Sequence, residues 1–136
     1  MSVKLNPYLS FKDNAAQAMK FYESVFGGKL NMSTFKESGM SSGPADENLV
    51  MHSQLDTDDD ITLMASDTPQ GMEYRPGTNV SISLSGNDEA KLRGYWEKLS
   101  SGGTTTMPLE KAPWGDTFGM CTDKFGIHWL VNISGK

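Results

Sequence analysis

Two histidines, His52 and His128, offer the imidazoles that could ligate a transition metal or exchange a proton near neutral pH. Each lies in a stretch where apolar and polar residues alternate, which is typical of a β-strand with one buried face. A catalytic metal site needs about three protein ligands, so two imidazoles fall short without further donors. Each ring can equally be a neutral group held by one hydrogen bond.

Other classes of chemistry lack their parts in this chain. There is no G-x-x-x-x-G-K-[ST] phosphate loop and no G-x-G-x-x-G dinucleotide loop. The single cysteine, Cys121, has apolar neighbours and no adjacent base, so we expect a buried residue rather than a nucleophile. One cysteine excludes an intramolecular disulfide and a four-cysteine zinc site, as is typical of proteins in a reducing compartment.

Length and charge favour one soluble domain, spanning 1–136. With 136 residues, 37% of them hydrophobic, the chain can form a core without disulfides. Seventeen acidic and twelve basic residues give a net charge of −5 without a basic run, so we expect no nucleic-acid partner. The start lacks a signal-peptide core, and no segment approaches the ~18 apolar residues of a membrane span. We therefore expect a cytoplasmic protein with no membrane partner.

Apolar spacing predicts one strand, one helix and three strands, and then the same order again. The first half has strands at 5–11, 29–37, 49–57 and 61–66, and its helix at 15–26 follows the capping residues Asp13 and Asn14. The second half has strands at 79–85, 104–109, 117–122 and 127–133, and its helix follows Asn87 or Asp88. Loops at 38–48 and 68–77 are rich in Gly, Ser and Pro.

The order repeats in the letters as well as in the elements. Sliding the chain so that Asn6 meets Asn79 also places Leu9 on Ile82 and Tyr22 on Tyr95. Two amphipathic units can match by chance, but the identities favour two repeats, at about 1–67 and 78–136.

Each βαβββ repeat predicts a sheet with a helix on one face, because only one parity of each strand is apolar. We expect an α+β fold in which the two modules form a curved mixed sheet with the helices on its convex face. Its concave cleft would be lined by the polar parity, and the alternative is a merely solvated sheet face. The predicted lining residues are Asn6, Tyr8, Ser10, His52, Gln54, Asn79, Ser81, Ser83, His128 and Asn132.

An aromatic residue in a Pro- and Gly-bracketed loop could close over such a cleft. Trp114 has that position, and the alternative is that it plugs the end of the second helix layer. Phe118 and Met120 share a parity on the next strand, so they could line an apolar end of the cleft or pack in the core.

The opening NPYLSFKDNAAQAMKFYESVFGG, the MHSQL and ITLMASD hairpin and the closing TDKFGIHWLVNI resemble the PhnB-like branch of the vicinal oxygen chelate superfamily. That superfamily includes glyoxalase I, bleomycin-resistance proteins and extradiol dioxygenases. The resemblance covers nearly the whole chain. It implies paired βαβββ modules, usually in a homodimer, around a cleft where many members bind a divalent metal.

The metal positions that the resemblance implies hold weak donors here. They fall on Asn6, His52, Asn79 and Leu130, of which only His52 is a strong ligand. His128 could join His52 if it lies at the cleft. Members of this branch are sometimes labelled demethylubiquinone methyltransferase-like, yet no Gly-rich loop for S-adenosylmethionine is present.

We therefore expect a cytoplasmic homodimer that binds a small organic ligand, with no cofactor and no obligatory metal. The alternative is a metal-dependent lyase or oxygenase that uses His52, His128 and water or a loop carboxylate. A third reading is a dimeric scaffold with a vestigial cleft.

Overall fold

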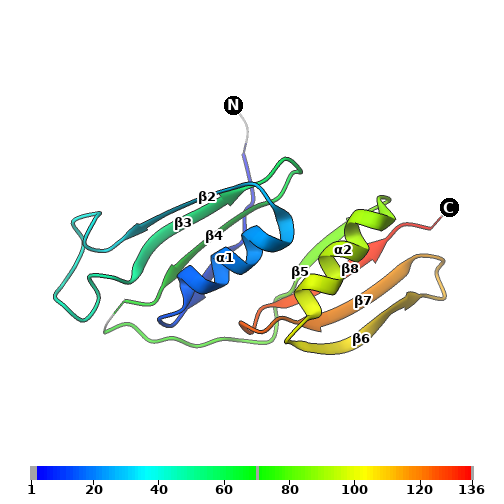
Figure 1. The fold of residues 1–136 in the computed structure, drawn as a ribbon. Helices are drawn as coiled ribbons and strands as arrows, with labels where there is room; N and C mark the ends of the chain where they lie inside the picture. The colour runs from blue at the N-terminus through cyan, green and yellow to red at the C-terminus, as the bar shows by residue number, and fades with distance from the viewer. Residues whose placement is uncertain (1–2, 70, 136) are drawn as a thin grey trace. The chain divides into compact units, whose positions relative to one another are not determined.

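Both halves of the chain fold as one strand, one helix and three strands, as the sequence predicts (Figure 1). The computed structural model describes residues 3–69 and 71–135. The chain divides into two units, Met1–Arg75 and Pro76–Lys136. The elements are β1 (Tyr8–Phe11), α1 (Ala15–Phe26), β2 (Lys29–Thr34), β3 (Val50–Asp56) and β4 (Thr62–Asp67), then β5 (Ile82–Gly86), α2 (Glu89–Ser100), β6 (Thr104–Lys111), β7 (Thr117–Thr122) and β8 (His128–Ile133).

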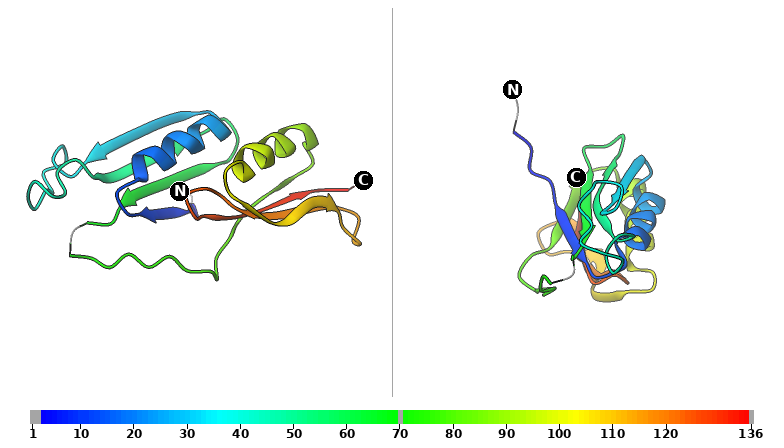
Figure 2. Two further views of the ribbon diagram at one scale, coloured as in Figure 1. Left: turned by 60° about the horizontal axis from the view of Figure 1, so that its bottom comes forward. Right: turned by 90° about the vertical axis from the view of Figure 1, so that its left-hand side faces the viewer.

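Each unit contains a four-stranded sheet with one parallel and two antiparallel pairs. The first sheet has the order β1-β4-β3-β2 with β1 parallel to β4, and the second has the order β5-β8-β7-β6 with β5 parallel to β8. A parallel pair requires a long crossover, which in both units includes the helix. Each helix covers one face of its own sheet (Figures 1 and 2). The α+β class and the mixed sheets are as predicted.

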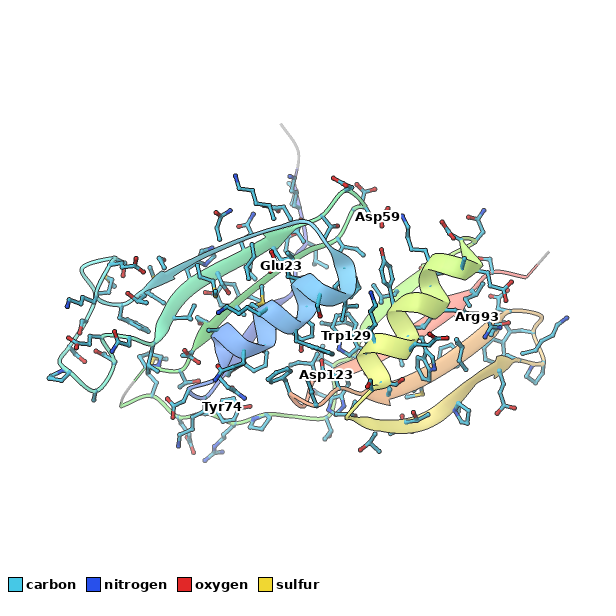
Figure 3. All side chains as sticks on the ribbon, in the orientation of Figure 1. Glu23, Asp59, Tyr74, Arg93, Asp123 and Trp129 are labelled. Carbon is cyan, nitrogen blue, oxygen red and sulfur yellow. The ribbon has the colours of Figure 1, made fainter. Side chains whose placement is uncertain are left out.

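The apolar parity of the strands packs beneath the helix, and the other parity stays uncovered. In the first unit the buried strand residues are Leu9, Phe11, Val50, Ser53, Leu55, Leu63, Ala65 and Asp67. In the second unit they include Leu84, Cys121, Trp129, Val131 and Ile133. The Trp129 indole N–H donates to the buried carboxylate of Asp123 at 2.9 Å (Figure 3). This bond satisfies the polar end of the large core side chain.

The first strand of each unit is shorter than the alternation predicts. Leu5 is 98% exposed and β1 begins only at Tyr8, while Val80 is 72% exposed and β5 begins at Ile82. Each first strand pairs only with the closing strand of its unit, and this pairing begins at Tyr8 and at Ile82. Pro7, which has no backbone N–H to donate, directly precedes β1.

The start of α1 is capped by a residue that local spacing does not point to. Asn14 occupies the N-cap position without a side-chain cap bond, so the predicted cap is wrong. The buried carboxylate of Asp67 accepts from Ala15 N at 2.9 Å and, with its other oxygen, from Val50 N at 2.8 Å. It thereby ties the helix to the ends of β3 and β4. In α2 the prediction is confirmed, because Asp88 accepts from Lys91 N at 3.1 Å.

The loop at 38–48 has a hydrogen-bonded centre. Asp46 is buried and accepts from the hydroxyl groups of Ser41 and Ser42 at 2.9 and 2.7 Å. The Ser42 hydroxyl is the largest cause of a lowered Asp46 pKa. Gly39 to Gly43 has the letters G-x-S-x-G of a hydrolase elbow, but that motif requires a strand-to-helix turn. Here the Ser41 hydroxyl is held by Asp46 inside a loop.

The turn before the last strand of each unit shows which residues of the two units are equivalent. In both, a five-residue turn closes with one backbone bond, from Thr57 N to Ile61 O and from Asp123 N to Ile127 O. Met64 then corresponds to Leu130, and their parallel partners are Tyr8 and Ser83. The letter-by-letter shift, which placed Tyr8 on Ser81, is therefore wrong by two residues in the first strands.

Neither helix of the described part has the length and apolarity to cross a bilayer.

Cys121 lies in β7 among core residues, as predicted. Burial, and secondarily the charge of Asp123, raises the pKa of its thiol to about 11. The thiolate is the reactive form of cysteine, so a thiol in this environment is inert near neutral pH.

We expect replacement of Asp67 by Asn to lower the free energy of unfolding by about 1–3 kcal/mol, because an amide has one acceptor oxygen where two buried N–H groups need partners. Urea titration measures the change. The matched control is Asn14→Ala, which removes no cap bond and should cost about 0.5 kcal/mol or less. Equal losses in the two variants would contradict the capping role of Asp67.

We expect Cys121 to react with a chromogenic disulfide reagent at pH 8 only after unfolding. Between pH 9 and about 11 the unfolded chain ionises this thiol and the folded chain does not. The stability that the neutral buried thiol contributes is therefore complete below pH 9 and is lost as the pH rises to about 11. Cys121→Ala should flatten that decline. Rapid labelling of the folded protein at pH 8 would show that the thiol is accessible.

Candidate functional site

The open face of the first sheet carries a Tyr–His pair. Tyr8 lies on β1 and His52 on β3, and β4 runs between these strands. The Tyr8 hydroxyl is 3.4 Å from His52 Nδ1, and the two ring centroids are 5.9 Å apart. The phenol donates when Nδ1 is the unprotonated nitrogen of the imidazole. This pair offers a ligand one aromatic face and one polar edge.

Two further predicted residues belong to the first unit. Gln54 follows His52 on the same face of β3, and its amide nitrogen donates to both carboxylate oxygens of Asp56 at 3.1 Å. Asn6 is half-buried and lies two residues before the start of β1, separated from it by Pro7. Tyr8, His52 and Gln54 therefore share one sheet face, as the alternation predicts.

His128, on the open face of the second sheet, has both ring nitrogens engaged. Nε2 lies 3.2 Å from the Gly77 carbonyl oxygen, which can only accept, so Nε2 carries the proton. Nδ1 lies 2.9 Å from the Thr122 hydroxyl, which can donate to it or accept from it. The ring connects β8 to the chain segment before β5. This arrangement matches the reading of His128 as an imidazole held by hydrogen bonds.

Trp114 and Phe118 form a pair on the second unit that we call the aromatic platform. Trp114 lies in the turn between β6 and β7 and is 63% exposed. Its ring meets Phe118 edge to face, with the centroids 5.7 Å apart. Phe118 shares the open face of the sheet with Met120 and His128. The platform thus presents an indole face next to an apolar strip.

Asp116 fixes the turn that carries the platform. Its carboxylate accepts from Gly135 N at 2.7 Å and from the amide of Asn132 at 2.9 Å, and it also hydrogen-bonds the Trp114 indole. These bonds, that of Gly135 foremost, lower the pKa of Asp116. Sequence reasoning did not single out this residue. The available signal was an aspartate two positions after a tryptophan in a Gly turn, which is a common pattern.

Asn79 and Ser81 are not on a strand. Both are exposed and precede β5, so strand parity does not assign them to a face. The predicted site residues fall into two groups, each described within its own unit. The first group is Asn6, Tyr8, His52 and Gln54, and the second is Asn79, Ser81, Trp114, Phe118 and His128.

The donors at the implied metal positions do not fit a transition metal. Leu130 has no donor atom, and Asn6 and Asn79 have only amide oxygens. Across residues 3–69 and 71–135, no three His, Cys, Asp or Glu side chains gather as ligands. The two nitrogens of His128 already have protein partners.

Comparison with known proteins places the chain in a family. Residues 3–132 match the family described as 3-demethylubiquinone-9 3-methyltransferase. The protein PA1353 from Pseudomonas aeruginosa is 36% identical with a TM-score of 0.85, and the match covers 99% of this chain and 100% of that one. The PhnB protein from Bacillus cereus is 25% identical with a TM-score of 0.77, covering 97% and 100%.

A more distant structure has the same fold. A glyoxylase/bleomycin resistance protein/dioxygenase domain from Frankia is 15% identical with a TM-score of 0.67, over 100% of this chain and 93% of that one. At this identity the likeness shows the fold alone. With two βαβββ units and a family match across almost all its length, this chain belongs to the family described as 3-demethylubiquinone-9 3-methyltransferase, and it has the fold of the glyoxylase/bleomycin resistance protein/dioxygenase domain.

Proposed function

We propose that this protein binds a small, flat organic ligand on the open faces of its sheets, without an obligatory metal or other cofactor. The observation that carries this proposal is the aromatic platform. An indole that is 63% exposed loses the free energy that burial would contribute. A bound ring would recover part of it by stacking.

The platform is held ready for a ligand rather than formed by one. The Trp114 ring contacts the carboxylate of Asp116 and packs edge to face with Phe118. A side chain that is already ordered loses little conformational entropy when a ligand stacks on it. The neighbouring Phe118 and Met120 extend the contact for an apolar part of the ligand.

Polar recognition is available on the first sheet. Tyr8 and His52 present a hydroxyl and an imidazole, and His52 Nε2 has no hydrogen bond among the described residues. Within the first unit these two groups suit the polar edge of a ligand. A transferred methyl group would need a cofactor site, and the absence of a Gly-rich loop from the sequence favours binding over methyl transfer. The poor donor set likewise disfavours the metal-dependent lyase or oxygenase.

The proposal includes a cytoplasmic homodimer. The sequence contains one cysteine, and that cysteine is buried as a free thiol, which suits a reducing compartment. Each sheet ends in unprotected edge strands, β1 and β2 in the first and β5 and β6 in the second. Association of two chains is a common way to cover such edges.

A thermal-shift screen of planar aromatic compounds, with bleomycin among the probes, tests the binding proposal. A compound present at 100 times its dissociation constant adds about 2.7 kcal/mol of stability. We expect Trp114→Ala to abolish the shift and Trp114→Phe to keep part of it. The control Val80→Ala removes another exposed apolar side chain of the same unit and should change nothing. The proposal would be contradicted if no compound in the screen bound, or if the shift of the unfolding temperature were as large in Trp114→Ala as in the original protein.

Elemental analysis of the purified protein tests metal independence. We expect far less than one zinc, nickel, manganese or iron ion per chain, and the same ligand-induced shift with and without EDTA, because residues 3–69 and 71–135 gather no three strong donors. His52→Ala should leave the metal content unchanged. About one equivalent of metal that disappears in His52→Ala would instead support the metal-dependent alternative.

A further inference from the structure

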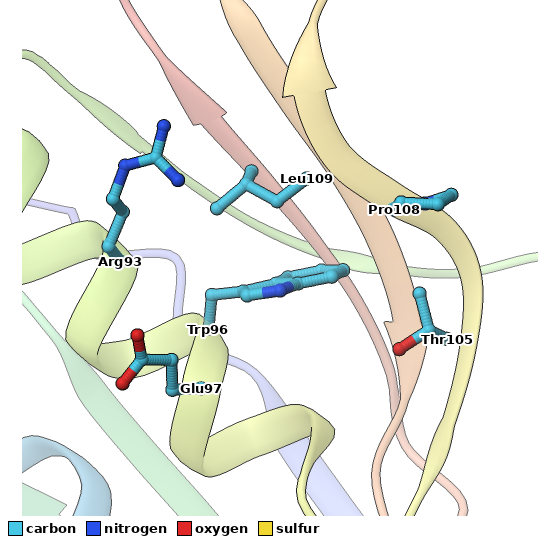
Figure 4. Close-up of a pocket in the computed structure, with 6 residues that line it drawn as sticks. All are labelled: Arg93, Trp96, Glu97, Thr105, Pro108 and Leu109. Carbon is cyan, nitrogen blue, oxygen red and sulfur yellow. The ribbon is translucent and has the colours of Figure 1, made fainter.

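A hollow of about 380 Å³ lies on the helix side of the second sheet, between α2 and β6 (Figure 4). It is on the opposite face of that sheet from the aromatic platform. Its volume falls in the range of sites for small organic molecules. The residues that line it are Arg93, Trp96 and Glu97 of α2 and Thr105, Pro108 and Leu109 of β6.

The hollow exists because β6 departs from a regular strand. Its pairing with β7 shifts register twice, between Thr105 and Met107 and between Met107 and Glu110. Pro108, which lacks a backbone N–H, lies within the second shift. Such bulges bend and twist an edge strand locally. The strand therefore does not close against the helix along its length.

Gly119 of β7 lets the Trp96 ring lie close to the sheet. A Cβ atom at Gly119 would lie 2.9 Å from Trp96 Cη2 and 2.9 Å from the Leu109 Cα. The corresponding residue of the first unit is Ser53, and there the helix residue Tyr22 is fully buried. The helix–sheet junction is filled in the first unit, whereas in the second a half-buried indole forms the wall of a hollow.

The two charged residues that line the hollow, Arg93 and Glu97, differ in their ion pairs. Arg93 Nε donates to Glu89 Oε2 at 2.8 Å, one turn earlier on α2. The Glu97 carboxylate makes no ion pair within the part of the chain that the structure describes. Among the described residues, the lining of the hollow therefore includes one carboxylate without an ion pair, on the residue that follows Trp96, whereas the charge of Arg93 is paired with Glu89.

We propose that this hollow binds a small organic cation with a flat apolar body. The ammonium group pairs with Glu97 and lies near the indole of Trp96, which is the best aromatic partner for a cation. The apolar body packs against Pro108 and Leu109 of β6, and Thr105 lies on the same strand (Figure 4). An anion of the same shape meets the Glu97 carboxylate, so charge sign sets the specificity.

Two probes of similar size and opposite charge test the proposal, phenethylammonium and 3-phenylpropionate. The indole N–H signals of Trp96, Trp114 and Trp129 are followed by NMR and assigned with single Trp→Phe variants. We expect phenethylammonium to shift the Trp96 signal in a saturable way and 3-phenylpropionate to leave it unchanged. The Trp114 signal reports the aromatic platform, so failure of either proposal is visible separately.

Two variants separate charge from shape. Glu97→Gln should raise the dissociation constant for phenethylammonium about fivefold or more, since it removes the ion pair and keeps the volume. Glu47→Gln removes the same charge from the other unit and should leave binding unchanged. Thr105→Tyr, on an exposed edge strand, should fill the hollow and abolish binding while leaving the fold intact. Its fold is checked by the unchanged Trp129 signal.

Three results would overturn the inference. They are equal shifts with both probes, no shift of the Trp96 signal up to the solubility limit of phenethylammonium, and unchanged binding in Glu97→Gln.

Discussion

One helix of twelve residues can cover only one face of a four-stranded sheet. In both units this constraint divides the strand residues into a buried parity beneath the helix and an uncovered parity on the other face. The buried parity is restricted to side chains that pack. Residues of the uncovered parity contribute little to the core, so Tyr8, His52, Phe118 and His128 can be selected for contacts with other molecules. The candidate site is a direct consequence of this division.

Local periodicity explains which parts of the fold could be predicted. Alternation assigned His52 and Gln54 to one face of β3, and it bounded β7 at 117–122 as the structure has it. Alternation did not show which distant residues would form hydrogen bonds with one another. The cap of α1 comes from Asp67, which is 52 residues further along the chain. The Gly77 oxygen that holds the His128 ring is 51 residues away. Such contacts depend on strand pairing, which the spacing of neighbouring residues does not encode.

The same reasoning explains the errors at the strand starts and in the candidate site. Alternation continues through Asn79 and Ser81, but a strand exists only where a neighbour supplies hydrogen-bond partners. One part of the aromatic platform, Trp114, could be predicted, because it is an aromatic residue in a loop bracketed by Pro and Gly. Its anchor Asp116 did not stand out, since its role arises from Asn132 and Gly135. The irregularity of β6 that creates the α2 hollow has one signal in the sequence, Pro108, which alternation alone does not take into account.

The two units show how one topology can serve different packing. With Tyr22 fully buried the first helix lies closed on its sheet, whereas Gly119 and Trp96 leave the second helix with a recess at its side. Because the βαβββ unit is present twice, one of the two units can be less tightly packed than the other. The first unit is then free to supply a filled core while the second keeps an irregular surface.

The parallel pairing of β1 with β4 joins Tyr8 to Met64 and so spans most of the first unit. During synthesis on the ribosome, β1 and α1 emerge early, but their sheet partner and the carboxylate of Asp67 emerge last. The nascent first unit therefore stays open until about residue 67 has cleared the exit tunnel. Slow translation of the loop at 38–48 would prolong exposure of the apolar side of α1 to chaperones.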